Sequence, residues 1–186
     1  FRLHLSGVVR DIAYNDGLGH RTSHFTGAGI LGGTLWLGAI NKVFGKDNIG
    51  GQMWVGAVGR YIPDDFGGNI ASVLAVDNGT SGIPITVDSK IQDDHGFTVF
   101  AQHYWTKILR STVAIGYNNQ NLASFLPPDV ANAPVTKTAH VNLIARPVPS
   151  VDLGIEGMWG EKTFQKSTGV PNKTATRVEF GGIWHF

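Results

Sequence analysis

Hydrophobic and polar residues alternate along much of the chain with a period of two. The clearest example is the segment 177–186, where large apolar side chains occupy even positions and polar ones occupy odd positions. The even set contains Val178, Phe180, Trp184 and Phe186, and the odd set contains Arg177, Glu179 and His185. Successive side chains of a β-strand point to opposite faces, so the pattern predicts a strand with one face toward lipid and the other toward water.

The same alternation recurs along the chain and predicts eight strands. They are expected at 1–13, 23–40, 49–61, 96–106, 108–118, 137–147, 151–162 and in a last segment after the loop 163–174. The stretch 62–95 is less regular, with weak strand segments near 69–76 and 83–92. These two segments predict either an additional hairpin or a loop that folds inward and narrows a pore.

The expected connections alternate in length. Turns near 41–48, 106–108 and 147–150 are short, whereas the loops that lie between them along the chain are longer. The longer loops are 14–22, 62–95, 119–136 and 163–174. Short turns at one end and long loops at the other are typical of an antiparallel, up-and-down transmembrane β-barrel with its long loops outside. The fold class predicted is therefore all-β, with residues 1–186 in a single barrel domain.

Composition supports the prediction of an all-β barrel and excludes several classes of function. The chain has 186 residues, 25 of them glycine, and a formal net charge of +1, which gives no overall attraction to nucleic acid. Cysteine is absent, which excludes disulfides, thiolate metal sites and cysteine nucleophiles. No run of 18 apolar residues occurs, so no membrane-spanning helix is expected. Hydrophobicity near the average suits strands that are half apolar and half polar.

Three segments and the last residue resemble a known family. They are Gly-Arg-Tyr-Ile at 59–62, the strand pair at 102–112 that begins Gln-His-Tyr-Trp, the segment 141–160 that begins Val-Asn-Leu-Ile-Ala-Arg-Pro, and the terminal Phe186. Together they resemble the C-terminal part of the DcaP-like bacterial outer-membrane porins. A terminal Phe on an alternating strand is itself similar to the C-terminal signature of outer-membrane barrels.

The resemblance implies a membrane channel. Members of that family are homotrimers of barrels with about sixteen strands, which lie in the outer membrane of Gram-negative bacteria in contact with lipid and lipopolysaccharide. A periplasmic coiled-coil segment precedes the barrel, and small, often anionic, solutes pass through it. This chain resembles the final eight or so strands. Either further strands precede residue 1, or the chain forms a small barrel of its own.

Five arginines fall on the face that the alternation assigns to the interior. They are Arg10, Arg60, Arg110, Arg146 and Arg177. Because arginine stays charged at every accessible pH, they are predicted to line a pore and attract anions. Avoidance of lipid alone also explains the placement, since arginine near the midplane costs about 2–4 kcal/mol. Asp152, Glu156 and Glu179 share the interior face and are expected to pair with some of these arginines.

Motifs for chemistry are weak. The spacing of Gly27, Gly29 and Gly32 matches a dinucleotide-binding fingerprint, but it lies inside an alternating strand segment without the following helix. Six aspartates between 62 and 95 make a calcium site conceivable, yet their spacing matches no calcium-binding loop. The seven histidines lack metal-ligand spacing on a helix. We therefore expect no enzymatic activity, catalytic residue, metal or cofactor.

Two other functions compete with the porin hypothesis. A closed eight-stranded barrel has an interior just wide enough for side chains, and would be a structural or adhesive protein without a through-pore. A soluble eight-stranded ligand-binding barrel would need an apolar interior and a polar exterior. The direction in which the arginines and the leucines point decides between the soluble and the membrane hypotheses.

Overall fold

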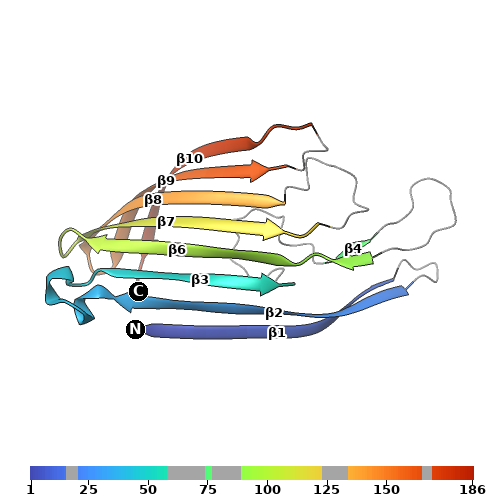
Figure 1. Ribbon diagram of the computed structural model, residues 1–186. Helices are drawn as coiled ribbons and strands as arrows, with labels where there is room; N and C mark the ends of the chain where they lie inside the picture. The colour runs from blue at the N-terminus through green and yellow to red at the C-terminus, as the bar shows by residue number, and fades with distance from the viewer. Residues whose placement is uncertain (16–20, 58–73, 77–88, 123–133, 165–168) are drawn as a thin grey trace.

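The computed structural model describes residues 1–15, 21–57, 74–76, 89–122, 134–164 and 169–186. Eight strands form one antiparallel sheet in the order β1-β2-β3-β6-β7-β8-β9-β10 (Figure 1). Their bounds are β1 Arg2–Asn15, β2 Arg21–Trp36, β3 Asn48–Gly56, β6 Asp94–Tyr104, β7 Leu109–Gln120, β8 Val135–Val148, β9 Val151–Thr163 and β10 Lys173–Trp184. Each strand pairs with the next strand of this set, which confirms the all-β, up-and-down prediction.

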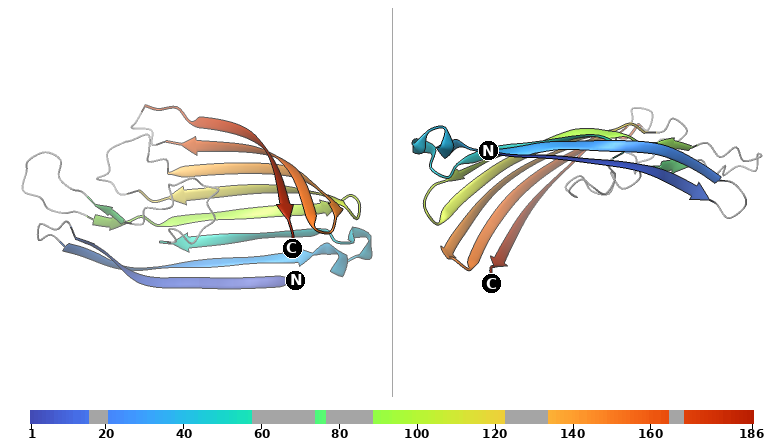
Figure 2. Two further views of the ribbon diagram at one scale, coloured as in Figure 1. Left: turned by 180° about the vertical axis from the view of Figure 1, so that it is seen from behind. Right: turned by 90° about the horizontal axis from the view of Figure 1, so that it is seen from below.

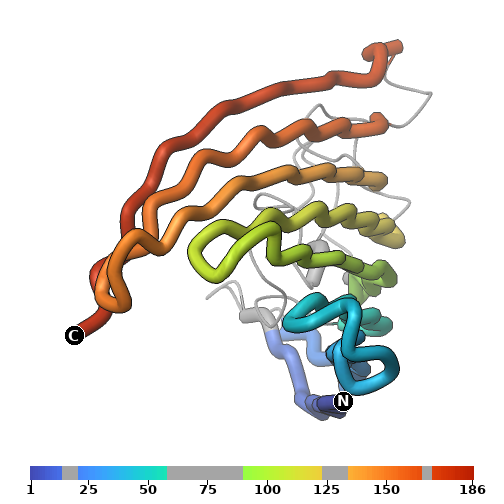
Figure 3. Tube along the Cα trace, turned by 90° about the vertical axis from the view of Figure 1, so that its left-hand side faces the viewer, coloured from blue at the N-terminus to red at the C-terminus, as the bar shows by residue number. Residues whose placement is uncertain are grey.

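The sheet is curved into an open trough. Figure 2 shows that both termini lie at the end of the sheet where the connections are short. Figure 3, a view along the strands, shows the curvature of the sheet. Strands β1 and β10 are the two edges, and within the described residues they do not pair with each other. The closed eight-stranded barrel is therefore not the architecture observed. No helix in the described part of the chain is long and apolar enough to cross a membrane.

The connection between β2 and β3 differs from the prediction. Strand β2 ends at Trp36 rather than at residue 40, and two short 3-10 helices follow, η1 Leu37–Ala39 and η2 Lys42–Phe44. The side chain of Asn41 accepts a hydrogen bond from the Val43 amide at 3.0 Å, which starts the second helix. Gly45 ends it with φ of 55°, a left-handed conformation that glycine adopts without strain.

The expected additional hairpin forms, but outside the main sheet. Strand β4, Leu74–Val76, pairs with β5, Ser89–Ile91, in a separate two-stranded sheet. Strand β3 pairs directly with β6, from Asn48 opposite Gln102 to Gly56 opposite Asp94. The hairpin therefore adds no strand to the trough. Residues 58–73 and 77–88 lie outside the described part, and so does the end of the strand expected at 49–61.

The strand register separates the two faces of the sheet by polarity. Several side chains on the concave face are buried, among them Trp54 (3% exposed), Asn118 (2%) and Asp152 (4%). Side chains on the convex face diverge, and the apolar Val113 and Val141 are 53% and 55% exposed. Most leucines and valines of the sheet thus point outward, and Arg10, Arg110, Arg146 and Arg177 point inward. This is the arrangement predicted for a membrane barrel and the reverse of a soluble one.

A buried contact stabilises the concave face near the long loops. Trp54 on β3 lies over Gly96 on β6, and its indole Nε1 donates to Asn118 Oδ1 on β7 at 2.9 Å. A Cβ at position 96 would lie 2.6 Å from the Trp54 ring, so glycine there is required by the close approach. The Asn118 amide in turn donates to Asp94 Oδ1 at 3.4 Å.

We expect Trp54→Phe to destabilise the fold. The substitution removes the indole donor and leaves the buried Asn118 oxygen without it, which costs about 1–3 kcal/mol in the free energy of unfolding. Urea or thermal unfolding of the protein in detergent micelles measures the change. Trp159→Phe is the matched control, because Trp159 is exposed on the convex face. Equal effects of the two substitutions would contradict the buried role of Trp54.

Candidate functional site on the concave wall

The concave wall is defined as the inward-facing residues of the eight-stranded sheet. Most of the charged side chains of the sheet lie on this wall. Its acidic residues are Asp94, Asp152, Glu156 and Glu179, and its basic residues are Arg2, Arg10, Arg110, Arg146, Lys162, Lys173 and Arg177. With histidines neutral, the described wall has a surplus of three positive charges. The positive charge is unevenly distributed over the wall, because several basic side chains form ion pairs with acidic ones.

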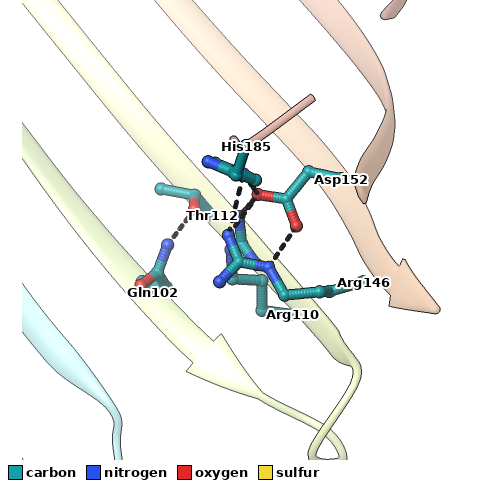
Figure 4. Close-up of polar contacts among 6 residues, drawn as sticks. All are labelled: Gln102, Arg110, Thr112, Arg146, Asp152 and His185. Carbon is teal, nitrogen blue, oxygen red and sulfur yellow. Dashed lines mark hydrogen bonds and ion pairs between the residues drawn. The ribbon is translucent and has the colours of Figure 1, made fainter. Parts of the chain in front are cut away.

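Four side chains meet at the short-turn end of the wall and form the Asp152 cluster, which consists of Arg110, Arg146, Asp152 and His185 (Figure 4). Arg146 binds the carboxylate with two groups, Nε to Oδ1 at 2.6 Å and Nη2 to Oδ2 at 2.5 Å. Arg110 Nη2 donates to Oδ2 at 3.0 Å. His185 Nε2 lies 3.2 Å from the same oxygen. One buried carboxylate therefore holds two guanidinium groups and the penultimate residue of the chain.

The local backbone positions this cluster. Asp152 is the second residue of β9, directly after the tight turn that joins β8 to β9. The Arg146 amide donates to the Ile108 carbonyl at 2.7 Å, which brings the end of β8 against the β6–β7 turn. The His185 amide donates to the Ser150 carbonyl at 2.8 Å and secures the end of β10. Charged side chains from β7, β8 and β9 therefore meet His185, which follows β10, where the hairpins turn.

A transverse row of polar side chains crosses the wall beside the cluster. Register places Asn48, Gln102, Thr112 and Asn142 on successive strands β3, β6, β7 and β8. The Asn48 amide donates to Gln102 Oε1 at 3.2 Å, and the Gln102 amide donates to Thr112 Oγ1 at 3.1 Å. Asn142 Oδ1 accepts from the Thr112 backbone amide at 3.0 Å. These contacts fix the side chains to the wall.

The row continues onto β9 and β10 with two acidic residues. Glu156 and Glu179 are direct register partners. Glu156 Oε1 lies 2.8 Å from His140 Nδ1, and Glu179 is ion-paired with Arg177. The row therefore changes from neutral amides and a hydroxyl on β3–β8 to carboxylates on β9 and β10.

A separate contact joins the two neighbouring short turns. Asp47 Oδ1 accepts from the Tyr104 backbone amide at 2.9 Å, and Oδ2 lies 2.6 Å from His103 Nδ1. The Tyr104 N–H, opposed by the burial of the carboxyl and aided by His103, holds the pKa of Asp47 below its ordinary value of 3.8. The β2–β3 connection is thereby attached to the end of β6.

The five arginines predicted from the sequence have different surroundings. Arg110 and Arg146 share Asp152, and Arg177 pairs with Glu179. The Arg10 guanidinium, near the long-loop end, donates to the Ala57 carbonyl. Arg60 lies outside the described residues. All four described arginines are on the concave wall as predicted, and the expected pairing with acidic residues of that face is observed. Their role in anion selectivity stays a prediction.

Sequence analysis missed the histidine contacts. The lack of metal-ligand spacing does not reveal that His103, His140 and His185 each lie beside a carboxylate. For His140 the signal was present, because it and Glu156 are both even-numbered residues of adjacent predicted strands. His103 and His185 lie at strand ends, where alternation assigns faces poorly. No group of three or more potential metal ligands occurs among the described residues.

A comparison with solved structures places this arrangement among known folds. The chain is similar to the outer membrane channel DcaP of Acinetobacter baumannii, with a TM-score of 0.65 and 18% sequence identity. The sheet has the fold of part of that channel. The likeness covers 100% of this chain and 47% of the DcaP chain, so the chain spans about half the length of that protein. No family model matches the sequence, and no curated protein matches it.

The likeness to DcaP supports the fold inferred from the sequence motifs. It agrees with the polar concave face, the apolar convex face and the two unpaired edges, because a sheet that corresponds to part of a larger barrel has free edges by itself. The observed wall is thus eight strands of a barrel-type fold, with its charged groups on the side that faces the barrel axis.

We expect Asp152→Asn to lower the thermal stability of the protein. The neutral amide no longer compensates Arg110 and Arg146, and a buried cation that loses its partner is destabilising. Heat-modified mobility on gels or circular dichroism in detergent measures the unfolding midpoint. The double variant Arg146→Gln/Asp152→Asn should lose less stability than the sum of the two single variants. Glu161→Gln, on the convex face of the same strand, is the control, because it changes a partly exposed ion pair with Lys137, which contributes little to stability. An equal loss there would contradict the role of Asp152.

The Asp47 contact predicts a specific pH dependence. Because the folded-state pKa of Asp47 is lowered, its contribution to stability is present above its unfolded-state pKa near 3.8 and is lost as the pH falls through the lower folded-state value. Asp47→Asn should therefore reduce stability at neutral pH, and the difference from wild type should vanish in strong acid. Unfolding midpoints measured from pH 7 to pH 2 test this. A difference that stays constant over the range would contradict it.

Proposed function

We propose that the chain forms the wall of an outer-membrane diffusion channel for small hydrophilic solutes. The observation that carries the proposal is the separation of the two faces, with most of the charged side chains on the concave face and exposed apolar ones on the convex face. A soluble protein rarely exposes an apolar surface this extensive. Lipid covers such a surface in an outer-membrane barrel, while water fills the interior.

The height of the apolar surface fits a bilayer. On β9 the convex positions are apolar or glycine from Val151 to Trp159, and the first charged one is Glu161. Ten residues of strand measure about 33 Å, and a tilt of 35–45° reduces this to about 25 Å, the height of the apolar band of such barrels. The other convex charges, Asp11, Arg21 and Lys137, also lie toward the long loops.

Aromatic side chains border this surface. Trp105 and Trp184 are exposed at the short-turn end, and Phe97 stacks on Tyr117 toward the other end with ring centroids 5.9 Å apart. Aromatic rings gather at both membrane–water interfaces, where the apolar body meets lipid and the polar tip meets water. This distribution supports a membrane span between the two aromatic borders, and the short turns place the periplasmic side in the proposed orientation.

The proposed mechanism involves no chemistry. Solutes pass through an aqueous lumen and are sorted by its width and by its fixed charge. The surplus of basic residues on the wall favours small anions, although Arg110, Arg146 and Arg177 are partly neutralised by their acidic partners. The proposal includes further strands that pair with the edges of β1 and β10, to about sixteen in all, and the trimeric assembly and contact with lipopolysaccharide typical of such channels.

Planar-bilayer recording of the intact protein tests the proposal. Discrete conductance steps are expected, and the reversal potential in a potassium chloride gradient should show a preference for chloride. Arg110→Gln should weaken that preference because it removes one cation from the wall. Lys137→Gln is the matched control, since Lys137 lies on the convex face. Absence of conductance steps would refute the channel, and a preference for potassium would refute only the anion selectivity.

A further inference from the structure

A hollow lies on the concave wall over β7–β10. Its volume is about 340 Å³, and its charged lining residues are Arg110, Asp152, Glu156 and Glu179. Gly154 on β9 and Gly181 on β10 are register partners between these charged groups. With no side chains at these two positions, the wall is recessed there, and the charges border the recess on two sides.

The side of the hollow nearer the short turns has a positive charge. Arg110 and Arg146 together contribute two positive charges, and Asp152 supplies one negative charge between them. Asp152 is buried and is fully used by its guanidinium partners and His185. With His185 neutral, one net positive charge remains beside the hollow. Arg110 reaches from β7 across β8 to the β9 carboxylate, so its guanidinium lies at the edge of the recess.

The opposite side has a negative charge. Glu156 and Glu179 are direct register partners, and like charges at such positions repel each other. Arg177 balances one of them, and with His140 neutral one net negative charge remains. Both carboxylates stay accessible, because the side chains of Glu156 and Glu179 are 31% and 44% exposed. A cation placed between them would relieve their repulsion.

We propose that this hollow binds linear zwitterionic solutes, with an ammonium group between Glu156 and Glu179 and a carboxylate at Arg110. Asp152 and Glu156 are four residues apart on β9, or about 13 Å along the strand. Side chains extend into the hollow from both sides, so a solute of about 7–11 Å, the length of two to three extended residues, spans it. Short peptides and ω-amino acids have this form. The inference rests on the channel function proposed above and specifies a solute class for it.

Uptake of three probes with the same six-carbon chain tests the inference. The probes are 6-aminohexanoate, adipate and 1,6-diaminohexane, each labelled and supplied to liposomes that contain the intact protein. We expect 6-aminohexanoate to enter faster than the diamine. The double variant Glu156→Gln/Glu179→Gln should lower the ratio of 6-aminohexanoate to adipate uptake by about twofold to tenfold, as expected for the loss of two exposed ionic contacts. Glu161→Gln, on the convex face of β9, should leave the ratio unchanged.

The outcomes separate this inference from the channel proposal. If ion conductance persists in the double variant and the uptake ratio does not change, the zwitterion site is wrong and the channel stands. If the wild-type protein conducts no ions and admits no probe, both proposals fail. If the double variant does not fold, the single variant Glu179→Gln, which changes the more exposed carboxylate, should still lower the ratio. An unchanged ratio in that folded variant would also overturn the inference.

Discussion

The structure depends on one constraint, the two-residue period of a β-strand whose backbone hydrogen bonds are made by its neighbours. In the proposed membrane setting no water is present to satisfy an exposed amide or carbonyl, which requires a continuous sheet. The period assigns each side chain either to the convex or to the concave face. Apolar Val113 and Val141 and polar Thr112 and Asn142 alternate on the same paired strands for this reason. A register shift of one residue would exchange the faces.

Two kinds of contact hold the side chains of the polar face in place, namely ion pairs and hydrogen bonds between neutral groups. Asp152 binds two guanidinium groups and connects the ends of β7, β8 and β9 to His185, which follows β10. It therefore stabilises this end of the sheet and also neutralises part of the positive charge of the wall. The amide and hydroxyl row from Asn48 to Asn142 is neutral. Charge is therefore concentrated on β7–β10, where Gly154 and Gly181 open the hollow. The same residues that hold the strands together set the electrostatic field over the concave wall.

The alternation of odd and even positions was enough to assign individual residues to a face of the sheet. It could not identify which residues of that face form ion pairs with each other. Arg110, Arg146 and Arg177 were expected inside because each falls on the polar side of its strand, and they are there. The pairing of Arg110 with Asp152 joins residues separated by 42 positions and requires the β8 register between them. That register shifts between Ala145 and Val148, next to Arg146, and local alternation does not reveal such an irregularity.

The sequence by itself determined the strand number of the wall, its up-and-down order and the opposite polarity of its faces, because these follow from local periodicity and turn chemistry. Only the tertiary structure decided that the β4–β5 hairpin lies outside the wall and that the β1 and β10 edges are apart. It also decided that two acidic residues, Asp152 and Glu179, partly neutralise three of the arginines. These features depend on curvature and on contacts between strands distant in the chain, which a period of two residues does not encode.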